Sequence, residues 1–79
     1  MKKVFVDVIV KHTLEGSLIP LSVMWGDGRQ FEVDRVMDIR KAASLKVGGC
    51  GWRYTCRIQG KETFLYLDND KWFVESKEA

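Results

Sequence analysis

Two stretches of this chain alternate strictly between two kinds of side chain, and this period of two constrains the fold more than any other feature. Residues 52–59 read Trp-Arg-Tyr-Thr-Cys-Arg-Ile-Gln, and valine occupies every second position from Val4 to Val10. Successive side chains of a β-strand point to opposite faces of its sheet, whereas a helix repeats every 3.6 residues. Both stretches therefore predict strands, with the rings of residues 52–59 facing inward and its arginines facing water.

Shorter runs of strand-forming residues, separated by turn residues, occupy much of the remaining chain. Further strands are predicted at residues 18–25, 29–37, 63–67 and 71–75. Turns are predicted at residues 15–17, 26–28, 59–61 and 68–70, where glycine or asparagine tolerates a positive φ. Pro20 lacks the N–H that a ladder needs, so it is expected at the start of its strand or on an edge.

Two segments depart from this regular pattern. Val36 is out of phase with Phe31 and Val33, and one extra residue in a bulge near residues 34–35 would restore the alternation. Residues 38–46 contain helix-forming side chains and a cap candidate at Asp38, but the segment is too short for an independently stable helix. A loop or a single helical turn is predicted there.

Six short strands in 79 residues predict one all-β domain over residues 1–79. The expected fold is a small antiparallel barrel, SH3-like or OB-like, with at most one short helical turn, because closure removes exposed strand edges. A sandwich of two sheets is the alternative. So small a core needs large side chains, and at least two of Trp25, Trp52 and Trp72 are expected inside it.

The residues that carry chemistry are few. Cys50, Cys56 and His12 are too few and too scattered for a structural zinc site, which takes four ligands. Cys56 is predicted to be a core residue and Cys50 a loop thiol, both reduced, and an activity that depends on these two thiols is kept as an alternative. A single histidine provides no evident base for a nucleophile. We therefore predict no enzyme, no cofactor and no metal site.

Two short motifs suggest ligands only at first sight. Residues 68–70 read Asp-Asn-Asp, but the glycine and the glutamate that complete a calcium loop are missing. Residues 48–51 read Gly-Gly-Cys-Gly and precede a strand, whereas dinucleotide-binding glycines open a helix. A hairpin turn and a sharp bend are the expected roles of these motifs.

The start of the chain resembles a signal peptide only in its first residues. Lys2 and Lys3 precede an apolar run, but Asp7 interrupts this run and no cleavage site follows. No apolar stretch approaches the roughly 20 residues that span a bilayer. The chain also has only two cysteines, whereas small secreted domains usually carry more. A cytoplasmic protein without membrane contact is therefore expected.

The charge distribution marks one region as a candidate binding face. The net charge is only +2, yet no acidic residue occurs between Asp38 and Glu62. The residues of this region predicted to form a basic face are Arg40, Lys41, Lys46, Arg53 and Arg57. Its partner is expected to be a protein or a nucleic acid. Binding of single strands also requires aromatic platforms, for which Tyr66 and Phe73 are the candidates, although the pattern leaves their facing open.

A structural or homo-oligomeric interaction protein is the alternative function. The strands at residues 4–10 and 64–67 carry apolar side chains on both faces, and one small barrel does not easily cover both. This alternative predicts a homodimer with no role for nucleic acid.

Four blocks of sequence, at residues 25–29, 31–36, 51–54 and 72–75, begin with Trp-Gly-Asp-Gly-Arg and end with Trp-Phe-Val-Glu. Together they resemble a family of short uncharacterised bacterial small-β-barrel proteins over residues 19–75. The Arg-Tyr and Trp-Phe pieces are also similar to unassigned domains attached to Y-family polymerase-like proteins. These resemblances imply a small barrel, and they imply no activity and no site residue.

Overall fold

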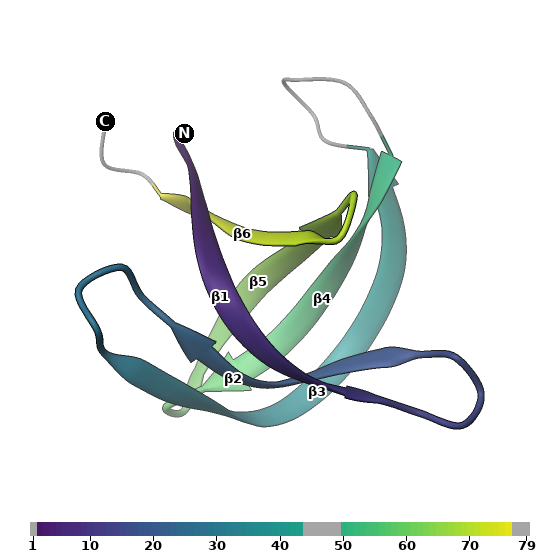
Figure 1. Ribbon diagram of the computed structural model, residues 1–79, viewed down its shortest axis with the longest axis horizontal. Helices are drawn as coiled ribbons and strands as arrows, with labels where there is room; N and C mark the ends of the chain where they lie inside the picture. The colour runs from purple at the N-terminus through teal and green to yellow at the C-terminus, as the bar shows by residue number, and fades with distance from the viewer. Residues whose placement is uncertain (1, 44–49, 77–79) are drawn as a thin grey trace.

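The computed structural model describes residues 2–43 and 50–76 of the chain, with side chains at residues 3–41 and 51–75. The described residues form a closed antiparallel barrel in which the strands follow one another in chain order and the last pairs with the first (Figure 1). No helix occurs among them. The strands are β1 (Lys2–His12), β2 (Leu18–Met24), β3 (Gln30–Ala43), β4 (Cys50–Ile58), β5 (Lys61–Asp68) and β6 (Lys71–Ser76). The prediction of a small all-β barrel is confirmed, and the sandwich is wrong.

The first two hairpins are built alike. In the loop between β1 and β2 the Gly16 N–H donates to the Thr13 carbonyl at 3.0 Å, and between β2 and β3 Gly28 donates to Trp25 at the same distance. Both glycines have a φ of 93°. A turn followed by one left-handed residue is a common three-residue hairpin loop, and glycine occupies that position without strain. Both turn predictions are confirmed.

The last two hairpins use shorter turns. Gln59 and Gly60 have φ values of 52° and 75°, and Asn69 and Asp70 have values of 53° and 66°. Two successive left-handed residues give the turn whose twist matches that of the flanking strands. The predicted turns at 59–61 and 68–70 are confirmed.

The long strand β3 corrects the sequence analysis. It runs to Ala43, so the loop or helical turn predicted from residue 38 is wrong for residues 38–43, and residues 44–46 lie outside the described part. The register of β3 against β4 shifts twice, and each shift inserts one unpaired residue. The shift at Asp34 confirms the predicted bulge, and the one at Met37 was not predicted.

These two bulges change the period of the inner face of β3. They place Val33, Val36 and Ile39 opposite inward-facing residues of β4, although the three side chains are three positions apart in the sequence. A spacing of three is typical of a helix rather than a strand. The bulges also bend the strand so that it closes the barrel. Residues 38–43 suggested a helical turn for another reason, their helix-forming side chains, and their pairing with β4 overrides that preference.

A groove interrupts the barrel between β2 and β3. These strands pair only over Ser22–Met24 and Gln30–Glu32, and a groove of about 650 Å³ separates their other halves. Pro20 lies in the half of β2 that pairs with β1 alone, as expected for a proline at an edge. The proline and the bulges of β3 interrupt both free edges, which discourages pairing with a further strand.

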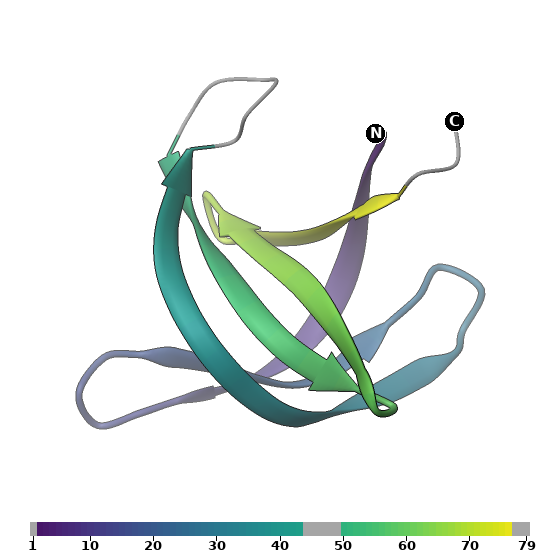
Figure 2. The same cartoon turned by 180° about the vertical axis from the view of Figure 1, so that it is seen from behind.

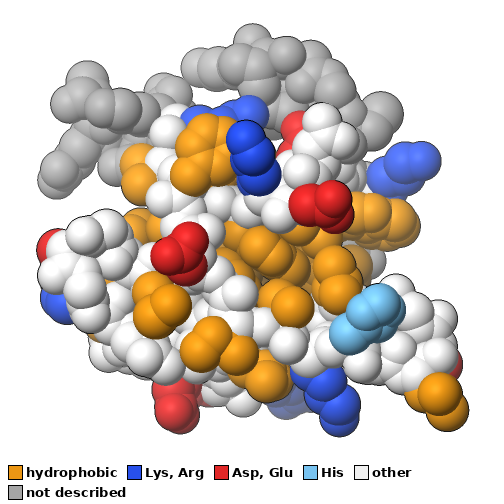
Figure 3. All heavy atoms as spheres, in the orientation of Figure 1, with side chains coloured by type: hydrophobic (Ala, Val, Ile, Leu, Met, Phe, Trp, Pro, Cys, Tyr) orange, Lys and Arg blue, Asp and Glu red, His pale blue; other side chains and the backbone are white. Residues whose placement is uncertain are grey.

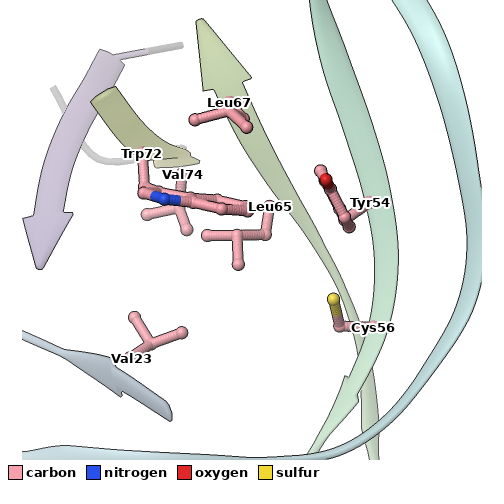
Figure 4. Close-up of a cluster of buried hydrophobic side chains, with 7 residues drawn as sticks. All are labelled: Val23, Tyr54, Cys56, Leu65, Leu67, Trp72 and Val74. Atoms are coloured by element: carbon pink, nitrogen blue, oxygen red, sulfur yellow. The ribbon is translucent and has the colours of Figure 1, made fainter. Parts of the chain in front are cut away.

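The core fills the ring from one side of each strand. Figure 4 shows its side chains converging from β2, β4, β5 and β6. The cluster consists of Val23, Tyr54, Cys56, Leu65, Leu67, Trp72 and Val74. The Trp72 ring lies 5.0 Å from that of Tyr54, whose hydroxyl donates to the Leu18 carbonyl at 2.7 Å.

The tryptophans contribute less to this core than predicted. Trp72 is buried, and Trp25 is partly buried against the cluster. Trp52 remains 46% exposed although it has the same strand parity as Tyr54. It lies where β4 leaves the core, beside a small pocket that Tyr54 also lines, so alternation alone did not determine its burial.

Candidate functional site

The arginines of β4 lie on the outer side of the barrel, as predicted. Arg53 and Arg57 alternate with Tyr54 and Cys56, which are buried in the core. On β3, Arg40 lies opposite Arg53. Arg35, which the sequence analysis did not include, lies opposite Arg57 because the bulge shifts the register by one residue. Figure 2 shows the strands β3, β4 and β5 side by side from this direction.

The other predicted site residues do not all join this surface. Lys41 pairs with Trp52, so it projects from the opposite side of the sheet. Lys46 lies outside the described residues. Arg40 is on the outer side, but its Nε atom lies 2.6 Å from the Asp38 carboxylate and is bound there. The structure thus brings together Arg40, Arg53 and Arg57.

Arg53 and Arg57 form no ion pair with any described residue. Glu62 lies opposite Arg57 without reaching ion-pair distance. The Asp34 carboxylate instead accepts a hydrogen bond from the Gly60 N–H at 3.2 Å, which ties β3 to the turn between β4 and β5. The two guanidinium groups are therefore not neutralised in pairs by the neighbouring strands.

Arg53 lies against an aromatic ring. Its guanidinium carbon is 4.9 Å from the centre of the Phe64 ring, within the range of a cation–π contact. Its Nε atom is buried and has no hydrogen-bond partner among the described residues. An unsatisfied buried donor costs stability. The position of Arg53 is thus held by ring packing and not by an acceptor.

Aromatic side chains continue this surface across the next strands. Tyr66 pairs with Arg53 on one side and with Phe73 on the other, and Phe73 pairs with Phe5. The rings of Tyr66 and Phe73 are stacked with centres 5.1 Å apart, and Phe5 meets Phe73 edge-on at 5.8 Å. We call Tyr66, Phe73 and Phe5 the outer aromatic row. Tyr66 and Phe73, whose facing the sequence left open, thus lie on the same side of the sheet as Arg53.

The rings on this side differ in exposure. Phe73 is 3% exposed, whereas Phe5 is 58% and Phe64 is 43% exposed. Burial raises the pKa of Tyr66, and the carboxylate of Glu75 raises it further. Lys3 places its Nζ atom 4.4 Å from the ring centre of Phe73, so a cation lies at this end of the row as well.

The charges on this side are mixed and nearly balanced. The basic side chains are Lys3, Lys11, Arg35, Arg40, Arg53, Arg57 and Lys71, and the acidic ones are Asp7, Glu32, Asp38, Glu62, Asp68 and Glu75. Lys3, Arg35, Phe5 and Phe64 were not predicted to belong to this surface. Alternation along each strand gives the side of the sheet on which they lie, but their proximity to Arg53 follows only from the register between strands.

The remaining candidate chemistry is not assembled. Cys56 is fully buried, and burial raises the pKa of its thiol to about 11, so it stays protonated at neutral pH. The side chain of Cys50 lies outside the described part, and His12 is exposed at the end of β1. In residues 3–41 and 51–75 we find no group of three metal-binding side chains. None of the described segments is a helix of the length and hydropathy that would cross a bilayer.

Comparisons of the chain with protein-family models, with curated proteins and with solved structures find no match. The two resemblances suggested by residues 19–75 therefore stay predictions. The inference of function depends on the geometry of the outer side of β3 to β6 and β1.

Proposed function

We propose that this barrel is a non-enzymatic module that binds nucleic acid through the outer side of β3, β4, β5, β6 and β1. The observation that supports the proposal most is the position of Arg53 and Arg57. Both project from the same side without an ion-pair partner among the described residues, and exposed aromatic rings continue that side. Arginine with free donors next to exposed rings is typical of surfaces that bind phosphates and bases.

The two arginines suit contacts with a phosphate backbone. They are four residues apart on β4, a distance of about 14 Å at roughly 3.4 Å per residue. Each guanidinium carries donors that match two oxygens of one phosphate. Two such groups on one rigid strand provide separate phosphate contacts without a large net charge on the chain.

Nucleic acid fits this surface better than an acidic protein does. An acidic segment would be attracted by the arginines but would leave the exposed rings of Phe5 and Phe64 unused. Nucleobases have flat faces that stack on such rings, and each stacked base adds about 1–3 kcal/mol. Cations and rings on one side therefore favour a ligand with alternating phosphates and bases.

The proposal is tested by titrating isotope-labelled protein with short mixed-sequence DNA and RNA at two salt concentrations and following the backbone amide shifts. We expect salt-sensitive shifts on β4 around Arg53 and Arg57. The double variant Arg53→Gln, Arg57→Gln should lower the slope of log affinity against log salt by about 1.4, because two phosphate contacts are lost at ~0.7 each on a single strand.

The matched control is Arg29→Gln. Arg29 is exposed in the hairpin between β2 and β3 and is paired with Asp27, away from β4. This variant should bind like the wild type. Shifts confined to other regions, or none at either salt concentration, would refute the proposal.

Self-association is the second candidate, supported by exposed apolar side chains on β1 and β2. Phe5, Ile9 and Leu21 are 58%, 46% and 45% exposed. Figure 3 shows exposed apolar groups on this face, with acidic and basic groups between them. A concentration-dependent dimer in sedimentation equilibrium, lost in Ile9→Lys, would support this candidate; a monomer at high concentration would exclude it.

A further inference from the structure

We infer that the ligand of the outer side is single-stranded, and that its unpaired bases stack on Phe64 and Phe5, at the two ends of a path across β5, β6 and β1. This inference rests on the proposed function and names the ligand more closely.

The exposed rings are Phe5 and Phe64, and the partly buried Tyr66 lies between them. Phe64 and Tyr66 are two residues apart on β5, or about 7 Å, and Tyr66 is separated from Phe5 by two strand intervals of roughly 4.8 Å each. Bases in a duplex rise by about 3.4 Å. Rings at these distances match a strand whose bases have been pulled apart, and they match consecutive bases of a duplex poorly.

Phe73 supports the two rings at the middle and one end of the path. It is 3% exposed, and its ring centre lies 5.1 Å from that of Tyr66 and 5.8 Å from that of Phe5. Phe73 therefore fixes the two outer rings in place and is itself too buried to meet a base. Rings that are held before binding lose little side-chain entropy when a base stacks on them.

A cation lies beside each exposed ring. The guanidinium carbon of Arg53 is 4.9 Å from the centre of the Phe64 ring. The Nζ atoms of Lys3 and Lys71 are 5.8 and 6.0 Å from the centre of the Phe5 ring. A base stacked on either ring thus has a positive group within reach of its phosphate, which is the combination that single-strand binding surfaces use.

The buried Nε of Arg53 supports a role in binding. It has no acceptor among the described residues, and such a donor lowers stability. The packing of Arg53 on Phe64 therefore stabilises the fold less than a fully hydrogen-bonded arginine would. Its position over Phe64 holds the charged end of the side chain beside the stacking platform, where a phosphate would gain from it.

Duplexes would use this side differently. Paired bases hide their faces within the stack, and proteins read them by placing a helix or ribbon in a groove. A duplex would therefore contact the arginines and leave Phe5 and Phe64 without a stacking partner. Removal of the Phe5 and Phe64 rings should therefore weaken binding of a single strand and leave binding of a duplex unchanged.

The test compares fluorescence anisotropy of labelled oligothymidylate with that of a duplex of the same length, on wild type and on the double variant Phe5→Leu, Phe64→Leu. Leucine keeps an apolar side chain on the sheet but removes the flat face. We expect the wild type to prefer the single strand, and the variant to lose at least about fivefold in single-strand affinity per ring. Its affinity for the duplex should not change.

The matched control is Ile9→Ala, because Ile9 is exposed on the same strand and has the same strand parity as Phe5 but has no ring. It should leave single-strand affinity unchanged. Circular dichroism and a thermal melt check that each variant folds. If the double variant does not fold, ultraviolet crosslinking of a bromouridine oligonucleotide to the wild type, read by mass spectrometry, should identify Phe5, Tyr66 or Phe64.

The outcomes separate the two proposals. Binding of neither ligand would refute the proposed function itself. Equal binding of both ligands, no effect of the two ring substitutions, or crosslinks confined to other residues would overturn the single-strand inference while leaving nucleic-acid binding in place.

Discussion

Trp72 and Phe73 are neighbours on β6, and both are buried, but they are buried in different ways. Trp72 points into the ring and is covered by the core residues of the other strands. Phe73 points outward, where the described chain provides no second layer, and is 3% exposed only because side chains of the same sheet lie over it. Closure of the barrel thus buries the indole of Trp72. A lid of neighbouring side chains on the outer side buries the phenyl ring of Phe73.

The difference bears on the binding that we propose for the outer side. The lid over Phe73 includes Phe5, which is itself 58% exposed. An aromatic side chain that covers one ring while leaving its own face in water gains only part of the free energy that full burial would provide. Single exposed apolar residues are common on surfaces. A connected row of rings bordered by cations is a different case, and a ligand that covers it would complete the burial.

The largest effect is expected from a truncation on the inner side. Leu65 is fully buried in the core, and Leu65→Ala should lower the free energy of unfolding by about 2–5 kcal/mol. The substitution leaves a cavity, and the closed barrel is too rigid to collapse into it. Urea denaturation measures this change. A loss below about 1 kcal/mol would mean that the inner side is as adaptable as the lid.

Alkaline pH should also act on the inner side. The pKa of the Cys56 thiol is raised from 9.0 to about 11 by burial, so the folded chain keeps this proton after the unfolded chain has released it. The contribution of this thiol to the free energy of unfolding should be fully present below about pH 9. It should be lost as the pH rises toward 11, by about 2–3 kcal/mol in total. Burial raises the pKa of Tyr54 as well, which adds to the loss in the same direction.

Urea midpoints measured across this pH range test the effect, with Cys56→Ala as the control. The alanine variant should retain only the pH dependence of the other groups. The same slope in both proteins would show that the thiol does not titrate as its burial indicates.

The smallest effect is expected on the outer side. Phe73→Ala should cost about 2 kcal/mol, less than the roughly 3–5 kcal/mol of a phenylalanine in a closed core, because Phe5 and Tyr66 can settle into the space. The measurement is again urea denaturation, combined with oligonucleotide binding. A large loss of stability with unchanged binding would show that the lid serves folding alone.

The sequence allowed the architecture to be predicted because most strands keep a period of two and most turns carry residues that tolerate positive φ. It failed on residues 38–43 of β3, where helix-forming side chains suggested a helical turn and pairing with β4 determines a strand. The bulge at Asp34 was predicted from the lost alternation, whereas the one at Met37 was not. Strand pairing limits the prediction of the site in the same way. The side of the sheet on which Arg53 and Arg57 lie followed from alternation, whereas the neighbours Tyr66, Phe73 and Phe5 follow from the pairing of distant strands.

Lys41 illustrates the limit of charge patterns. It belongs to the same acid-free stretch as Arg40, but adjacent residues of a strand point to opposite sides, and only Arg40 joins Arg53. A run of basic residues indicates local charge, and the strand determines how that charge is divided between the two sides.

The short pairing between β2 and β3 has a consequence for how the ring opens. Only Ser22–Met24 and Gln30–Glu32 hold these strands together, whereas β3 remains paired to β4 from Val33 to Ala43. Partial unfolding begins where the fewest hydrogen bonds must break, and the ladder between β5 and β6 is equally short, with three residue pairs. The barrel therefore has two short ladders at which it can open. Release of β2 from β3 exposes the amides of β2 to solvent exchange, whereas release of β6 from β5 separates Tyr66 from Phe73.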